Sequence, residues 1–366
     1  MATTLERRQV LDLRVAAQQL DRTAGTPADT AVLDLGVQDT GPDGGLWALV
    51  LRGVDVAALP GDALATVWTI RGAPHLYRRS DLPGVLAATA PFSEADAAKR
   101  IYDAAGPLKA AGIGTVEALD TIAATMRSLV TAPMAKGEVS GRLTELLDPV
   151  HVRHCTPCDA THPWEMPFRL AALRAGLELQ AGTSPPVLQP VPGLAPADTV
   201  PERLDVVRGY LRLLGPATPR HVAGYLDAPL ADVRAHWPDD AVEVSVDGER
   251  RWLLAADADR LDGLPTAAGV GLLGPFDLLL QARDRELLVP DRDLAKTLWP
   301  TLGRPGGLLV DGEVAGTWRA KKSGARVTVS VRLWRAPTPA LRERITAQAE
   351  RLAAFRGLGL AGVALD

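Results

Sequence analysis

Three consecutive polar side chains, Gln38, Asp39 and Thr40, end the apolar segment "VLDLGVQDTG" and lead into a Gly-rich turn over residues 41–45. An amide can orient a water molecule without acting as a base, and a carboxylate can stabilise developing positive charge. This trio therefore raises the possibility of polar chemistry mounted on a rigid element. The structural alternative is that Asp39 and Thr40 cap a helix that begins after Pro42.

Whether these three side chains can converge on one site depends on the helix that positions them. The pattern predicts one helix over 29–39 and another over 43–52. In a continuous helix Gln38 and Asp39 would diverge by about 100° and could not hold the same water. If the helix breaks at Gln38, as the Gly41–Pro42 pair favours, they could converge.

Two predicted hairpins carry cations that could contact phosphates. The segment 65–79 reads as two strands around Gly72, and it carries Arg71, His75, Arg78 and Arg79. The segment "RAKKSGAR" (319–326) reads as a hairpin tip with a Ser-Gly turn, and it carries Arg319, Lys321, Lys322 and Arg326. The alternatives are a core-facing His75 in a solvated hairpin, and charges at 319–326 that only confer solubility.

The charge distribution favours an anionic partner for the C-terminal part. Residues 301–366 hold 11 basic and 5 acidic side chains, a net of +6, whereas the whole chain carries -4. The remaining 300 residues therefore carry -10. A basic module on an acidic body points to a polyanion as partner.

Both cysteines of the chain lie in the segment "HVRHCTPCDATH" (151–162). Cys155, Cys158 and His162, with His154, could supply four ligands to a structural zinc ion. The alternative is a hairpin turn with two reduced thiols. Two cysteines do not form a disulfide framework in a chain of 366 residues, and we expect no other cofactor.

The periodicity predicts an α+β fold of about three winged-helix modules. The clearest module covers 202–262, in which two short helices and a hairpin around Asp247–Gly248 follow a first helix. Looser copies are predicted over 1–92 and 93–182, followed by a Pro-rich linker over 183–201. A β-rich subdomain over 263–366 contains the basic hairpin and a closing helix at 338–355. The N-terminus has no apolar signal segment and no run approaches a membrane span, so we expect a cytoplasmic monomer without membrane contact.

Four stretches resemble a bacterial family of winged-helix proteins that includes the AlkZ-like DNA glycosylases: "LGVQ" (35–38), "WTIRGAPHLYRRSDL" (68–82), "LLGPFDLLLQARD" (272–284) and "DGEVAGTWRAKKSGARVTVSV" (311–331). The resemblance spans about residues 10–355. It implies tandem winged helices in a C shape around a basic channel for double-stranded DNA. It also implies a monofunctional glycosylase that hydrolyses the N-glycosidic bond of alkylated or bulky-adduct purines.

The family's catalytic pair is Gln–apolar–Gln. Gln38 matches the first glutamine, Thr40 stands in the place of the second, and Asp39 replaces the apolar residue between them. Two other functions stay open for such a chain. One is a DNA-binding protein of the same fold without catalysis, which the change at residues 39 and 40 favours. The other is a transcription regulator, which would need a dimerisation surface.

Overall fold

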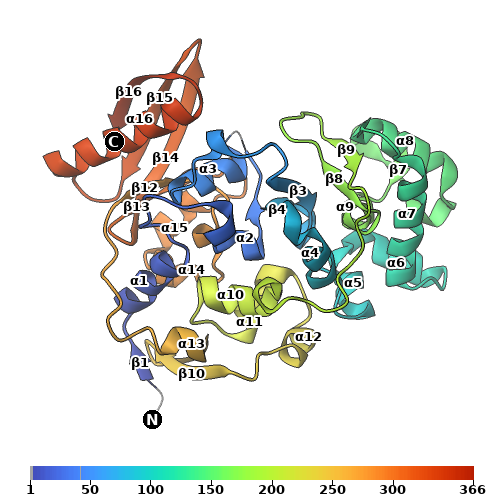
Figure 1. Ribbon diagram of the computed structural model, residues 1–366, viewed down its shortest axis with the longest axis horizontal. Coiled ribbons are helices and arrows are strands. Elements are labelled where there is room, and N and C mark those ends of the chain that lie inside the picture. Colours follow the sequence, from blue (N-terminus) through green and yellow to red (C-terminus); the bar gives the residue numbers. More distant parts are fainter. Residues whose placement is uncertain (1–2, 42) are drawn as a thin grey trace. The chain divides into compact units, whose positions relative to one another are not determined.

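The structure is a computed structural model that describes residues 3–41 and 43–366, and the fold is mixed α+β (Figure 1). The chain divides into two compact units, each assembled from separate segments. Unit 1 comprises Met1–Leu59, Tyr210–His221 and Pro238–Asp366, and unit 2 comprises Pro60–Gly209 and Val222–Trp237. The subdivision into three winged-helix modules stays a prediction. No helix among the described residues is both long enough and apolar enough to cross a membrane.

The N-terminal part of unit 1 contains β1 (Thr3–Leu5), α1 (Arg7–Ala17), α2 (Val32–Leu35), β2 (Val37–Gln38) and α3 (Gly44–Leu51). The helix predicted over 29–39 is wrong, because α2 is a single turn. Gly36 has a φ of 89°, a value that glycine adopts without a Cβ penalty, and it turns the chain out of the helix before Gln38. Gln38 therefore lies in a short strand and not on a helix.

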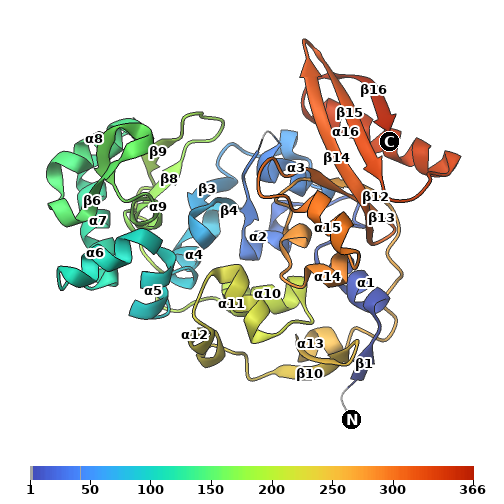
Figure 2. The same cartoon turned by 180° about the vertical axis from the view of Figure 1, so that it is seen from behind.

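Two sheets belong to unit 1. Strand β1 pairs in parallel with β10 (Ala241–Val246), which forms a hairpin with β11 (Glu249–Leu254). The second sheet has the order β12 (Val270–Leu273), β13 (Gly306–Val310), β14 (Glu313–Ser323), β15 (Arg326–Leu333) and β16 (Gly359–Leu365). Helix α16 (Pro339–Phe355) packs against this sheet, as both views show (Figure 2). The short helices α13 (Ala255–Ala258), α14 (Arg285–Leu288) and α15 (Arg292–Leu298) lie between these strands in the chain.

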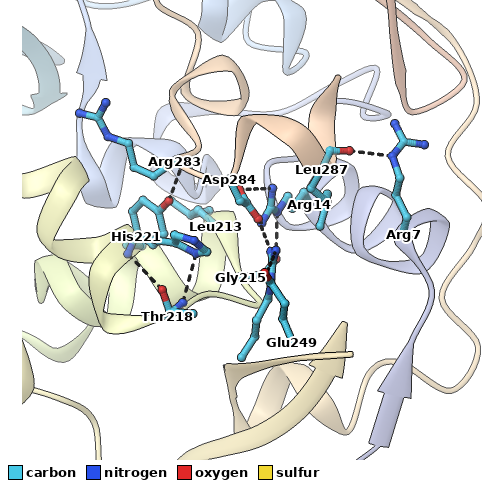
Figure 3. A network of polar contacts seen from close by, with 12 residues as sticks. Arg7, Arg14, Leu213, Gly215, Thr218, His221, Glu249, Arg283, Asp284 and Leu287 are labelled. Carbon is cyan, nitrogen blue, oxygen red and sulfur yellow. Dashed lines mark hydrogen bonds and ion pairs between the residues drawn. The ribbon is translucent and has the colours of Figure 1, made fainter. Parts of the chain in front are cut away.

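A buried ion network fastens α1 to distant segments of unit 1 (Figure 3). Arg14 donates to both carboxylate oxygens of Asp284, at 3.1 and 2.7 Å, and also to the Gly215 carbonyl at 3.1 Å. Arg251 of β11 forms an ion pair with the same carboxylate. Burial raises the pKa of Asp284, but Arg14 and Arg251 outweigh it and lower that pKa overall. The carboxylate therefore stays charged and forms ion pairs with two buried arginines, and Glu249 supplies a second negative charge beside Arg251.

Unit 2 contains a sheet with β4 (Pro74–Arg78), β3 (Leu64–Trp68), β8 (Leu177–Leu179), β9 (Val187–Pro190) and β5 (Met134–Ala135) as neighbours in that order. Its helices are α4 (Leu82–Ala88), α5 (Glu94–Arg100), α6 (Ala105–Ala110), α7 (Thr115–Leu129), α8 (Lys136–Leu146), α9 (Glu165–Arg174) and α12 (Leu230–Ala235). A core around Trp68, Met126 and Phe168 joins α7, α8 and α9 to the sheet. A separate hairpin consists of β6 (Val152–Cys155) and β7 (Ala160–Pro163).

Helices α10 (Val206–Leu214) and α11 (Pro219–Leu226) each span a boundary between the two units. With α12 and the β10–β11 hairpin, they occur in the order predicted for residues 202–262.

The predicted Pro-rich linker over 183–201 is not irregular throughout, because it contains β9, which pairs with β8 and β5. Proline lacks an N–H, but β9 has Pro only at its last position, where a strand tolerates it.

Candidate active site

Gln38 and Thr40 lie on the same side of the chain. Nε2 of Gln38 donates to Oγ1 of Thr40 at 3.1 Å. Within the described residues, Oε1 of Gln38 accepts no hydrogen bond. Both side chains are half-buried and line a small pocket whose other walls include Asp43, Phe276 and Asp277. The pair therefore presents an oriented amide oxygen and a hydroxyl to one cavity.

Asp39 does not line that pocket and instead binds the start of α3. Its Oδ1 accepts a hydrogen bond from the backbone N–H of Gly45 at 2.7 Å. A Cβ added to Gly44 would lie 2.1 Å from the same oxygen, and Gly44 also has a φ of 52°. Glycine at 44 thus makes room for the carboxylate, which also neutralises the positive end of the helix dipole. This contact matches the capping alternative for Asp39, whereas Thr40 bonds to Gln38 instead.

Two further carboxylates line the pocket, and both are ion-paired. Asp43 receives Nε and Nη2 of Arg356, each at 2.5 Å, from the end of α16. Asp277 receives Nη1 and Nη2 of Arg52 at 2.9 and 3.0 Å, and both side chains are fully buried. The wall of the pocket is therefore charge-neutral, which lowers the repulsion that a polyanionic ligand would meet.

Sequence reasoning missed these pairs as parts of the pocket wall. The block "LLGPFDLLLQARD" contains Asp277, but its arginine partner lies just after α3, far away along the chain. Asp43 directly follows the polar trio and its turn, and its partner is separated from it by 313 positions. The only local signal for these ion pairs was a carboxylate next to a Gly-rich turn. Such a signal does not identify which arginine pairs with the carboxylate.

The residues predicted at 71–79 are engaged within unit 2. His75 is fully buried, and burial together with the charge of Arg71 lowers the pKa of its imidazole to about 3. It is neutral and has no exposed atom in this conformation, as the core-facing alternative describes, and a contact of His75 with DNA stays a prediction. Arg78 is likewise buried and pairs with Asp81 at 3.1 Å. Local strand alternation could not reveal that both faces of β4 are covered.

Arg71 and Arg79 are more accessible, and each has an intramolecular partner. Arg71 stacks 4.7 Å above the ring centroid of Tyr225 and donates to the carbonyl of the same residue. Arg79 pairs with Glu178 at 2.9 Å. A contact of either arginine with DNA stays a prediction.

The basic hairpin at 319–326 is exposed along its whole tip. Strands β14 and β15 pair from Gly316↔Leu333 to Ser323↔Arg326, so the turn is Gly324–Ala325 and not the predicted Ser-Gly pair. Lys321, Lys322 and Arg326 are all exposed. Arg319 donates to the Gly303 carbonyl, and Arg326 donates to the Leu360 carbonyl at 2.9 Å. Two lysines and a partly anchored arginine are thus exposed at the tip of the β14–β15 hairpin of unit 1, where β16 also pairs with β15.

Three of the four predicted zinc ligands come together in unit 2. The ligand atoms of Cys155, Cys158 and His162 all lie within 4.8 Å of one another, and in the part of the chain that the structure describes they form the one such group. His154 is not part of it. The nearby His162 and the backbone N–H of Cys158 lower the pKa of the Cys155 thiol to about 7.

Comparison with known proteins agrees with this architecture. The model of the family described as DNA glycosylase AlkZ-like matches residues 32–355. The solved structure of the Streptomyces sahachiroi DNA glycosylase AlkZ superposes with a TM-score of 0.72 at 20% sequence identity, over 100% of both chains. At this identity the likeness establishes the fold. A comparison with curated proteins finds no match. Because the family match covers most of the chain, this protein belongs to the AlkZ-like DNA glycosylase family.

Proposed function

We propose that the protein is a monofunctional DNA glycosylase that removes alkylated or bulky-adduct purines from double-stranded DNA, with a water molecule oriented by Gln38. The observation that carries this proposal is the fixed amide of Gln38. Thr40 holds its Nε2, so its Oε1 is directed to accept a hydrogen bond from a water in the pocket. Membership of the family supports the reaction class.

Hydrolysis of the N-glycosidic bond of an alkylated purine needs little assistance from the protein. A purine alkylated at N3 or N7 is cationic, so it takes the electron pair of the N-glycosidic bond and leaves as a neutral base. The anomeric carbon becomes oxocarbenium-like and forms a bond to the oxygen of water, whose proton passes to solvent. Gln38 orients that water, and the Thr40 hydroxyl is placed to contact it from the same side. Since the target atom is shielded within a duplex, the nucleotide must be exposed before reaction.

A base-release assay tests the proposal. Duplexes carrying N7-methylguanine or a bulky N7 adduct are incubated with the protein, and abasic sites are then cleaved with alkali. Gln38→Ala should lower the release rate by about 100-fold or more, as removal of an oriented polar group does elsewhere, with nearly unchanged duplex affinity. The exposed Gln180 provides a matched control, because Gln180→Ala should release base at the parent rate. Undiminished release by Gln38→Ala would remove Gln38 from the reaction.

A second candidate function is DNA binding without hydrolysis. The position of Asp39 favours it, because that carboxylate is used by α3 and only Thr40 joins Gln38 at the pocket. Duplex binding with no release from either substrate would support this candidate. The third candidate, a transcription regulator, has no comparable support. Helix α16 buries its apolar side chains Leu341, Ile345, Ala349 and Leu352 within unit 1. That face is therefore not available as a dimerisation surface.

A further inference from the structure

The β6–β7 hairpin of unit 2 gathers both thiols of the chain and one imidazole at its turn. Cys155 ends β6, Cys158 ends the 3-10 turn Thr156–Cys158, and His162 lies within β7. Their sulfur and nitrogen atoms all lie within 4.8 Å of one another. Zinc–sulfur bonds of about 2.3 Å and zinc–nitrogen bonds of about 2.0 Å require only a modest contraction of this triangle.

The turn itself has the shape needed to present two thiolates to one ion. The 3-10 turn Thr156–Cys158 connects the two cysteines, so their sulfur atoms lie at one turn of the chain. Asp159 then adopts a left-handed conformation, with φ 46° and ψ 42°, and returns the chain into β7. Aspartate is one of the few residues with a Cβ that adopt this conformation readily. The chain adopts it where the return brings His162 back towards the two sulfurs.

The imidazole is oriented as a ligand. Nδ1 of His162 lies 2.8 Å from the carbonyl oxygen of Pro163. If Nδ1 carries the proton, it donates to that carbonyl and leaves the lone pair of Nε2 for a metal ion. A backbone carbonyl bound to the second ring nitrogen is the usual way in which proteins fix a metal-binding histidine.

Strand register excludes His154 from the same cluster. Arg153 faces His162, His154 faces Thr161, and Cys155 faces Ala160 across the hairpin. Because side chains alternate along a strand, Cys155 and His162 share one face while His154 occupies the other. The chain thus contributes three ligands, and the exposure of Cys158 leaves a fourth position open to solvent.

We propose that Cys155, Cys158 and His162 bind one Zn²⁺ ion, with water in the fourth position. Two thiolates and an imidazole form a donor set that prefers zinc over harder divalent cations. Zinc binds both sulfurs as thiolates, so any proton that they still carry passes to solvent, and the ion links the end of β6 to β7 across the turn. The strands of this hairpin pair only with each other, over four residue pairs, and α8 packs against β7, so the ion would add a link at the turn itself.

Cobalt substitution and thiol counting test the site in the full-length protein. The reduced, chelator-treated protein is titrated with Co²⁺ and then with Zn²⁺. We expect one equivalent of Co²⁺ to produce the thiolate-to-metal charge-transfer band and the visible bands of a tetrahedral site, and Zn²⁺ to displace it. Because the chain has only two cysteines, both thiols should become protected from a thiol reagent when Zn²⁺ is present.

Substitutions at exposed and half-exposed positions separate binding from folding. Cys158→Ser should weaken Zn²⁺ binding by about 100-fold or more, since even changes to groups that only support a ligand cost about 10- to 100-fold. His162→Ala should do the same, whereas His154→Ala serves as the matched control and should bind normally. The proposal is overturned if the parent protein produces no charge-transfer band, if both thiols stay reactive with Zn²⁺, or if Cys158→Ser binds as tightly as the parent. Loss of binding in His154→Ala would overturn the assigned ligand set.

Discussion

Gln38, Asp39 and Thr40 are adjacent in sequence but serve two different surroundings. Gln38 and Thr40 bond to each other at the pocket, and Asp39 bonds to the backbone of α3. The sequence identified all three as candidates, together with the capping alternative for Asp39. It could not decide between these uses, because the decision depends on the chain leaving α2 at Gly36, three residues earlier than the predicted helix end.

The contact of Asp39 with α3 makes a prediction about stability. Asp39→Ala should lower the free energy of unfolding by about 1 kcal/mol, the usual cost of removing a helix-capping side chain. Asp39→Asn retains an oxygen that can accept from Gly45 and should cost less. Urea denaturation measures both. If base release is measurable, Asp39→Asn should keep it, and a large loss of release in a stably folded Asp39→Asn would instead assign the charge a catalytic role.

Gly44→Ala should disturb the same contact from the other side. The added methyl group would meet the Asp39 oxygen and impose a left-handed conformation on alanine, at a cost of about 1–2 kcal/mol. Gly137→Ala is the matched control, because a Cβ at Gly137 meets nothing within 4 Å and the residue is within α8. Equal thermal stability of the Gly44→Ala protein and the parent would contradict the tight fit.

At the scale of elements, the β14–β15 hairpin is the best-placed candidate for duplex contact. Replacing Lys321 and Lys322 with Ala should weaken duplex binding and reduce the slope of log K against log salt by about 0.9 for each phosphate that the variant no longer neutralises. Lys296 offers a control, since it is exposed but pairs with Asp293 at 2.7 Å. Fluorescence anisotropy over a range of salt concentrations gives the slopes. An unchanged slope in the double variant would exclude this hairpin from the interface.

The buried ion network also acts between elements, since it joins α1 to β11 and to the segment before α14. Asp284→Ala would leave Arg14 buried without an anion and Arg251 with only the exposed Glu249 as its partner, and it should destabilise the protein by about 3–5 kcal/mol. Asp293→Ala, which removes an exposed partner of Lys296, should leave stability unchanged within error. Comparable urea midpoints for the two variants would show that the network contributes little.

At the scale of the whole molecule, local patterns predicted elements better than their long-range partners. The basic hairpin and the closing helix were found near their observed bounds, Pro339–Phe355 for the helix, because each carries its own periodicity and turn residues. Strand β16 and the partners of β1 and β9 were not found. Parallel pairing of β1 with β10 and of β15 with β16 joins segments that share no turn, so no local signal reports it.

Protonation of His75 should couple pH to the stability of the fold. The folded-state pKa of about 3 lies below the unfolded value of 6.5, so the unfolded chain binds the extra proton between these values. Stability from the neutral imidazole is therefore complete above pH 6.5 and is lost as pH falls towards 3. From pH 7 to pH 5 the loss should be about 2 kcal/mol.

Urea denaturation at the two pH values checks this expectation with two variants. His75→Gln should be less stable at pH 7 but should lose less stability at pH 5 than the parent does. His236→Gln alters an exposed imidazole and should follow the parent. A parent-like fall in His75→Gln would assign the acid sensitivity to other groups.

The different partners of Asp39 and Thr40 have a consequence for redesign. Position 40 can be varied without touching the anchor of α3, and position 39 can be varied without entering the pocket. Thr40→Gln would therefore install a second amide beside Gln38 while the helix keeps its carboxylate. The two neighbouring positions can therefore be varied separately, one to change the polar groups of the pocket and the other to change the stability of α3.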